Sequence, residues 1–184
     1  MRLSLFRLPL GFALAMAATS AFATTGTINF EGKITSSTCP IEVVNPGDGS
    51  VGNLVKMVDV EATRFTAVDQ DRGGKPFSLR LVPGAGCGLA VGGPNKATVS
   101  FSGLADASGD HFAVRDSADA AKGVAIVIKD KSGNAVKNGA ASVDYDLSET
   151  TPTDMQFDAF YRSTAAKVTA GTASADIAFV VSIN

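Results

Sequence analysis

The sequence predicts an all-β sandwich or barrel, and three observations support this. Short apolar or alternating runs recur along the 184 residues. Clusters of glycine, proline, asparagine and aspartate separate these runs, and such residues favour turns. Helical signals are weak, since 117–122 offers one turn at most and 60–68 is ambiguous.

The apolar and alternating runs predict eight strands in order along the chain: Thr27–Thr35, Ile41–Val44, Phe77–Val82, Ala97–Leu104, Val124–Lys129, Ser142–Leu147, Gln156–Arg162 and Ala175–Ile183. The predicted breaks between them are Asn45–Ser50, Arg72–Pro76, Pro83–Gly86, Gly92–Asn95, Asp130–Asn134 and Asn138–Gly139. Glycine accepts a positive φ and proline fixes φ, so these clusters are suited to end strands.

A secretory signal peptide is expected over residues 1–23. Arg2 and Arg7 make its start positive, Leu8–Ala18 is almost wholly apolar, and Ala21–Ala23 is a small-x-small cleavage site. An uncleaved anchor is the alternative, but the apolar run is too short to span a bilayer, and no later segment is long enough. Removing these 23 residues from the 184 leaves a mature chain of 161 residues, which begins at Thr24.

The mature chain has the length of one domain with a real core. The leader holds two arginines and no acidic residue, so 14 of the 16 basic residues remain against 18 acidic ones, a net charge of −4. This balance does not favour nucleic acid or an anionic membrane surface as a partner.

The two cysteines, Cys39 and Cys87, are expected to form a structural disulfide, because exported chains with an even count usually pair them. A metal site or a redox pair is the alternative. The chain has no Cys-x-x-Cys motif and only one histidine, which disfavours both. The chain-entropy model gives such a bond roughly 4 kcal/mol of stabilisation.

The strand at the start of the mature chain is amphipathic. Its apolar face carries Ile28, Phe30, Gly32 and Ile34, and polar side chains occupy the other face. Glycine weakens a strand, so Gly32 indicates a place where another group approaches closely. A β-bulge is the alternative reason for this glycine.

The last predicted strand places Ile177, Phe179, Val181 and Ile183 on one face. A strong core strand without a successor leaves an open sheet edge unless another strand covers it. The chain therefore carries an amphipathic strand near each end.

Motifs for catalysis, metals and cofactors are weak. His111 has no nearby cysteine or acidic cluster, and Gly84–Gly88 lacks the Lys-Ser/Thr of a phosphate loop. The segment Asp69–Gly73 hints at a calcium loop, yet Arg80 stands where the bidentate glutamate belongs. We expect no enzyme activity, no metal and no cofactor.

Several motifs agree in order with one known family. They are Gly26-Thr-Ile-x-Phe-x-Gly-x-Ile34 before Cys39, Phe77–Leu81 before Cys87, Gly123–Asp130, Phe157–Tyr161, Val168–Gly171 and the closing alternating strand. Together with the leader and the cysteine pair, they make the chain resemble a structural pilin of the chaperone–usher pathway, in the type 1 fimbrial subunit family. The resemblance covers nearly all of 26–184.

The resemblance implies an incomplete immunoglobulin-like sandwich that lacks its last strand and is completed by a donor strand from another subunit. Residues 24–35 would then be the N-terminal extension with the donor strand, and 36–184 the pilin domain. The donor residues are Ile28, Phe30, Gly32 and Ile34. The acceptor groove would be lined by Ile126, Ile128, Ile177, Phe179, Val181 and Ile183, although an ordinary closed core is the alternative reading of these residues.

The function that the resemblance implies is a structural pilus subunit, exported through the periplasm and polymerised by donor-strand exchange into a surface fibre used in adhesion. The implied partners are a periplasmic pilus chaperone, an outer-membrane usher and neighbouring copies of this or related pilins. A minor or adaptor subunit, or a secreted carbohydrate-binding sandwich, is the alternative. Ile183 stands where the family commonly carries a tyrosine that helps the chaperone hold the subunit.

Overall fold

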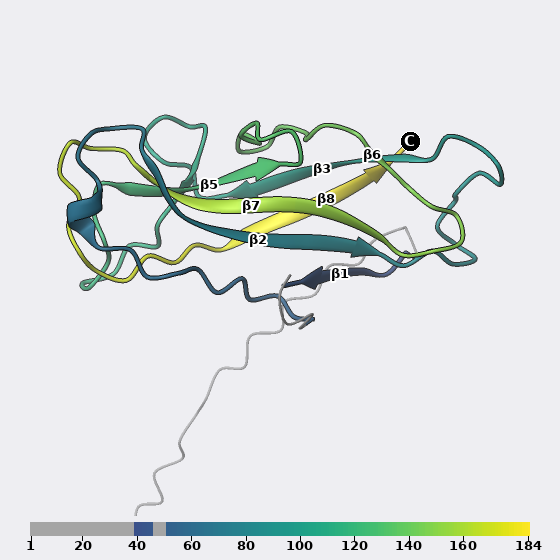
Figure 1. The fold of residues 1–184 in the computed structure, drawn as a ribbon, viewed down its shortest axis with the longest axis horizontal. Helices are drawn as coiled ribbons and strands as arrows, with labels where there is room; N and C mark the ends of the chain where they lie inside the picture. Colours follow the sequence, from purple (N-terminus) through teal and green to yellow (C-terminus); the bar gives the residue numbers. More distant parts are fainter. Residues whose placement is uncertain (1–38, 46–50) are drawn as a thin grey trace, which may run out of the picture. The chain divides into compact units, whose positions relative to one another are not determined.

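The computed structural model describes residues 39–45 and 51–184 (Figure 1). Its elements are β1 (Ile41–Val44), the 3-10 helix η1 (Ala62–Arg64), β2 (Asp71–Leu81), β3 (Lys96–Gly103), β4 (Phe112–Ala113), β5 (Val124–Asp130), β6 (Tyr145–Asp146), β7 (Thr153–Ser163) and β8 (Ile177–Ile183). The regular secondary structure of the described part is therefore almost wholly β, as the sequence predicts. No helix in this part has the length and hydrophobicity needed to cross a membrane.

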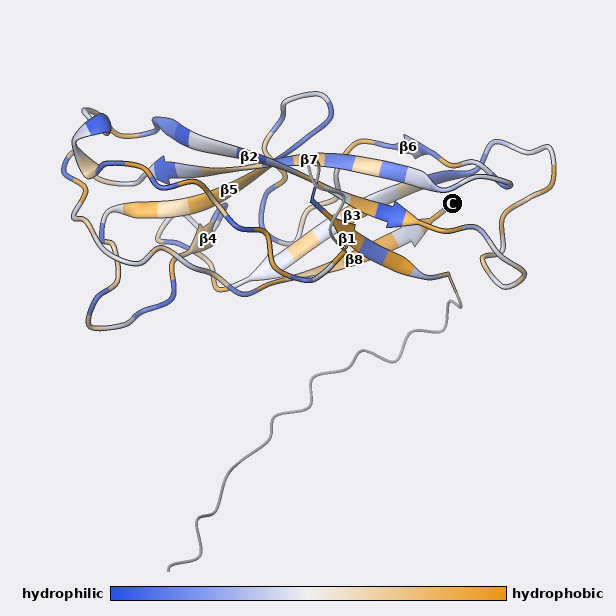
Figure 2. Cartoon of the chain, turned by 60° about the horizontal axis from the view of Figure 1, so that its bottom comes forward, coloured by the Kyte–Doolittle hydropathy of each residue, from blue (hydrophilic) through white to orange (hydrophobic). Residues whose placement is uncertain are grey.

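The strands form two antiparallel sheets. One has the order β1-β2-β7-β5-β4 and the other the order β6-β3-β8. Alternation of hydrophobic and hydrophilic residues is visible as bands along β1 and β7 in Figure 2. In such strands one face packs on the core and the other meets solvent. Strand β5, which lies between β7 and β4, differs because four consecutive residues, Ala125–Ile128, are buried.

Aromatic rings from both sheets fill the centre of the core. Phe77 of β2 stacks on Phe157 of β7 with ring centroids 5.6 Å apart. Phe101 of β3 meets Phe157 edge to face at 5.0 Å. Edge-to-face and offset pairs are the favoured ring geometries, so these contacts join the two sheets at a defined spacing.

One side of the sandwich is closed by the segment between β5 and β7. Its first part pairs with β5, where Val136 N–H donates to the Ile128 carbonyl at 2.8 Å. Its next part pairs with β3, where Ser142 N–H donates to the Val99 carbonyl at 2.8 Å. Because one segment bonds both sheets, the edges on this side are joined by the chain's own backbone.

The predicted turn at Arg72–Pro76 is wrong. These residues belong to β2, and the pairing with β7 shifts register between Arg72 and Lys75. Gly73 has φ 68°, and a Cβ on Gly74 would collide with the Phe160 ring. The two glycines thus form a bulge and a close approach inside a strand rather than ending it.

The start of β8 is fixed by a loop contact. Ala121 N–H donates to the Thr172 carbonyl at 2.9 Å, and Lys122 N–H donates to the Thr169 carbonyl at 3.2 Å. A Cβ on Gly171 would overlap the backbone of Asp119 and Ala121. Glycine at 171 is therefore what allows this segment to lie against 119–122 before it enters β8.

Candidate functional site

The outer edge of β8 is the candidate site. Within the described residues, β8 pairs with β3 alone, in the register Ala97↔Ile183 to Gly103↔Ile177. Lys96 and Asn184 exchange both backbone hydrogen bonds, at 3.3 and 2.9 Å. Hydrogen-bonded and non-hydrogen-bonded pairs alternate in an antiparallel ladder, so every second residue of β8 turns its N–H and C=O away from β3. These residues are Ile177, Phe179, Val181 and Ile183.

The same four residues turn their side chains toward the core. Each packs against the buried cluster yet stays partly exposed, while the residues between them are exposed. Val99 and Phe101 of β3, the cross-strand partners of Val181 and Phe179, are buried, at 0% and 3% exposure. Among residues 39–45 and 51–184, no strand pairs with this outer edge of β8, and the apolar side chains at the same positions are incompletely covered.

The first strand and the segment after it form the facing border. Ile41 and Val43 of β1, with Val55 and Met57, are also partly buried against the core cluster. β1 is the terminal strand of its sheet, as β8 is of the other. Since the opposite side is closed by the segment between β5 and β7, both terminal strands border the side that remains. We call the set Ile41, Val43, Val55, Met57, Ile177, Phe179, Val181 and Ile183 the open apolar edge.

The backbone N–H and C=O groups of β1 alternate in direction, as those of β8 do. Val82 N–H donates to the Pro40 carbonyl at 3.2 Å, which makes Glu42 and Val44 the hydrogen-bonded partners of β2. The backbone N–H and C=O of Val43 therefore point away from β2. The carbonyl accepts a hydrogen bond from Gly52 N–H at 3.0 Å. Part of this border is thus already covered by the chain that follows it.

The predicted disulfide between Cys39 and Cys87 is confirmed, with Cα atoms 4.7 Å apart. Cys39 lies two residues before the start of β1, and Cys87 lies in the loop after β2. The bond therefore fastens the terminal strand β1 to β2, its one sheet partner among the described residues. This matters because β1 is an edge strand of only four residues.

The predicted groove residues fall in two places. Ile177, Phe179, Val181 and Ile183 belong to the open apolar edge. Ile126 and Ile128 lie in β5, between β7 and β4, at 7% and 4% exposure within the core cluster. Their role in a groove stays a prediction. The predicted donor residues Ile28, Phe30, Gly32 and Ile34 lie outside the described residues.

Sequence reasoning missed the facing border. Ile41, Val43, Val55 and Met57 were not among the predicted groove residues, yet they pack on the same core. The alternation of Ile41 with Val43 and of Val55 with Met57 was the available signal. It was weak because each run is short and a turn cluster separates them.

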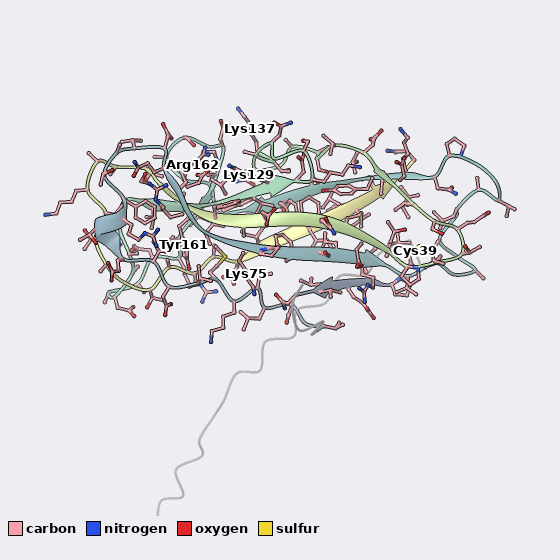
Figure 3. The ribbon with its side chains drawn as sticks, viewed as in Figure 1. Cys39, Lys75, Lys129, Lys137, Tyr161 and Arg162 are labelled. Carbon is pink, nitrogen blue, oxygen red and sulfur yellow. A yellow bond between two sulfur atoms is a disulfide. The ribbon has the colours of Figure 1, made fainter. Side chains whose placement is uncertain are left out.

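A polar cluster on β2, β7 and β5 serves the fold. Both Asp71 carboxylate oxygens accept hydrogen bonds from Arg162, at 2.7 and 2.8 Å, and Lys129 Nζ lies 2.8 Å from Oδ2. Burial opposes ionisation of Asp71, but the bonds from Arg162 and Lys129 outweigh it and hold the pKa of that carboxyl below its usual value. Figure 3 shows Lys129 and Arg162 toward one end of the sandwich and Cys39 toward the other.

The charges in this cluster compensate one another. Arg162 and Lys129 already bind both carboxylate oxygens of Asp71. His111 Nε2 lies 3.3 Å from Arg162 Nη1. In residues 39–45 and 51–184, no three His, Cys, Asp or Glu side chains gather in a way that could hold a metal.

Comparison with known proteins matches this architecture. The fimbrial protein family model matches residues 28–184. The chain is 36% identical over 176 residues to the probable major fimbrial subunit LpfA of Escherichia coli O157:H7, covering 92% of each chain. It is 34% identical over 161 residues to the fimbrial subunit type 1 of Salmonella typhimurium, covering 85% of this chain and 81% of the relative.

Solved structures agree in fold. A chaperone–usher pilus structure that describes rod uncoiling aligns with a TM-score of 0.60 at 18% identity, over 91% of this chain and 100% of that one. The P pilus rod subunit PapA aligns with a TM-score of 0.58 at 17% identity, over 79% of this chain and 99% of that one.

An immunoglobulin-like sandwich, which in this chain carries one disulfide, is the fold that the chain shares with those pilus subunits. The chain belongs to the fimbrial protein family. It is a structural subunit of the chaperone–usher type, exported and assembled into extracellular surface fimbriae.

Proposed function

We propose that the subunit polymerises by donor-strand exchange, in which residues 24–35 of one copy fill the open apolar edge of the next. The observation that carries this is the coincidence, at Ile177, Phe179, Val181 and Ile183, of outward backbone groups and half-covered apolar side chains. β-strand addition uses both, since main-chain bonds give affinity and side-chain pockets give specificity.

The donor segment is complementary in pattern to this edge. Ile28, Phe30 and Ile34 alternate along one face, and full burial of each contributes roughly 1.5–3 kcal/mol. Each new backbone hydrogen bond adds on the order of 1 kcal/mol. Ordering the segment opposes this at about 1–2 kcal/mol per residue. Gly32, which has no side chain, suits a position where the acceptor backbone or a core side chain comes close.

Before assembly the same edge needs a cover. An uncovered edge strand with an apolar face is an aggregation hazard. A periplasmic chaperone that lends a strand to β8 would remove the hazard, and an outer-membrane usher would then exchange that strand for a donor. The disulfide supports this, because it keeps β1 on β2 while the edge is empty. No catalytic activity is part of this function.

Deletion of residues 24–34 tests the proposal. Wild-type fibres should run on a denaturing gel without boiling as a ladder of multimers that collapses on heating in acid. The deletion variant should give one band while retaining the disulfide. A ladder from the deletion variant would contradict donor-strand exchange, and adding a peptide of residues 24–35 should cap the variant without extending it.

A further inference from the structure

The loop between β2 and β3 exposes an apolar tip. The fourteen residues from Val82 to Asn95 contain no charged side chain. Val91 within it is 94% exposed, more than any other large hydrophobic residue in the described part of the chain. Figure 1 shows this loop extending past the sheets at the end where the C-terminus lies.

The loop is held in one shape. Asn95 is 7% exposed, and its side-chain oxygen accepts a hydrogen bond from Ala90 N–H at 2.7 Å while its amide donates to the Ala90 carbonyl at 2.9 Å. Gly92 N–H donates to Glu149 at 3.1 Å. Val91 is therefore presented by a braced loop, and little conformational entropy remains to be lost when it meets a partner.

The loop also lies at the point where the chain enters the domain. The disulfide ties Cys87 of this loop to Cys39. Only residues 35–38 separate Cys39 from Ile34, the last predicted donor residue. Five extended steps span at most about 16–18 Å. A copy that holds this donor strand must therefore lie close to the end that carries the loop.

We propose that the loop of Val82–Asn95, with Val91 at its tip, is the contact by which one subunit rests on the neighbouring copy that holds its donor strand. This rests on the proposed donor-strand function. The partner surface is a second copy of this chain, since the short connection between donor strand and domain leaves no room for an intervening domain.

The composition and shape of this loop fit a contact between subunits better than they fit a hydrophobic side chain that is exposed by chance. Single exposed hydrophobic residues are common on protein surfaces. Interface cores, however, are distinguished by depletion of charge and by well-packed apolar groups. A charge-free stretch, a fixed backbone and a nearly fully exposed valine coincide here beside the connection to the neighbour.

Hydrogen exchange of the full-length mature chain tests this contact. Amides of 88–93 are compared in assembled fibres and in single subunits whose edge is filled by a synthetic peptide of residues 24–35. Both states have a filled edge, but only the fibre brings a second body to the loop. We expect exchange in the fibre to slow on the order of tenfold or more. Equal exchange in the two states would overturn the contact.

Val91→Asp supplies the matched variant, because a side chain this exposed is not needed for folding. The variant should still form the multimer ladder but lose the fibre-specific protection of 88–93. Leu54→Asp, at a residue 73% exposed on another segment, should keep it. Undiminished protection in Val91→Asp fibres would overturn the proposal. A wild-type chain that forms no ladder would instead overturn donor-strand assembly, and this contact with it.

Discussion

Phe179 of β8 lies directly opposite Phe101 of β3 in the antiparallel ladder, yet the two residues differ in solvent exposure. Phe101 is 3% exposed, whereas Phe179 remains partly exposed. The difference follows from position, because in the described part of the chain β3 is flanked by strands on both sides and β8 on one. The core is thus complete around one member of the pair and unfinished around the other.

Phe179→Ala is expected to cost more stability when the edge is filled than when it is empty. A phenylalanine removed from a closed core costs about 3–5 kcal/mol, and a partly exposed one costs less. Chemical denaturation of the 24–34 deletion variant, with and without the peptide of residues 24–35, measures both values. Val180→Ala is the control, since Val180 is 42% exposed on the outer face of β8. Equal costs of Phe179→Ala in the two states would show that nothing covers this ring.

Gly32→Leu is expected to leave the domain folded but to block polymerisation. If the donor strand runs close to the acceptor at this position, no room remains there for a side chain on the donor's apolar face. Gel ladders and the rate of fibre growth measure the effect. Asn29→Ala, on the opposite face of the same strand, should polymerise at the wild-type rate. Normal growth of Gly32→Leu fibres would favour the simpler role of a bulge.

Gly171→Ala is expected to destabilise the domain by about 1–3 kcal/mol, the usual range for overpacking. The added methyl group would overlap the backbone of Asp119 and Ala121, which cannot move aside as a side chain can. Thermal or urea unfolding measures the loss. Gly84→Ala, where an added Cβ meets nothing within 4 Å, should change stability little. If both variants unfold alike, the packing of 169–172 on 119–122 does not hold the start of β8.

Asp71 is expected to make stability fall at acid pH. Its pKa is lowered in the folded protein, so the unfolded chain binds the proton first as pH drops. The contribution is complete above the unfolded pKa of about 4 and is lost as pH falls through the folded value. Asp71→Asn should remove this part of the pH dependence and cost about 1.5–3 kcal/mol near neutral pH.

The control for this pH effect is Asp116→Asn. Asp116 also pairs with a lysine, Lys122, at 2.6 Å, but both side chains are largely solvent-exposed. Surface pairs contribute little to stability. Unfolding by urea at a series of pH values compares the two variants, and the same acid slope in Asp71→Asn as in the wild type would contradict the assignment.

The sequence predicted the sandwich and the disulfide because both depend on local patterns. Strand Ile41–Val44 has its predicted bounds, and β8 begins two residues later than predicted. β4 was missed, since Phe112 and Ala113 make only a two-residue pairing with β5. Strand Ser142–Leu147 is shorter in the structure, because Ser142 bonds Val99 outside the regular ladder.

The open apolar edge was only half predictable. The face of β8 follows from alternation along one strand, so the sequence predicted that Ile177, Phe179, Val181 and Ile183 share one face, and the structure packs that face on the core. That these residues line an acceptor groove stays a prediction. The facing border depends on which strand ends the other sheet, and that is a long-range property. Alternation also does not indicate whether a partner's donor strand would contact Ile128, which is buried in β5.

The disulfide has a mechanical consequence in a fibre. A pull on the residues before Cys39 does not fall on β1 alone, because the bond to Cys87 leads part of the tension directly to the loop after β2. Strand β2 pairs with β7 through most of its length, and force entering there is spread over many hydrogen bonds. A four-residue strand that would otherwise peel away one bond at a time is thereby shielded when the fibre is stretched.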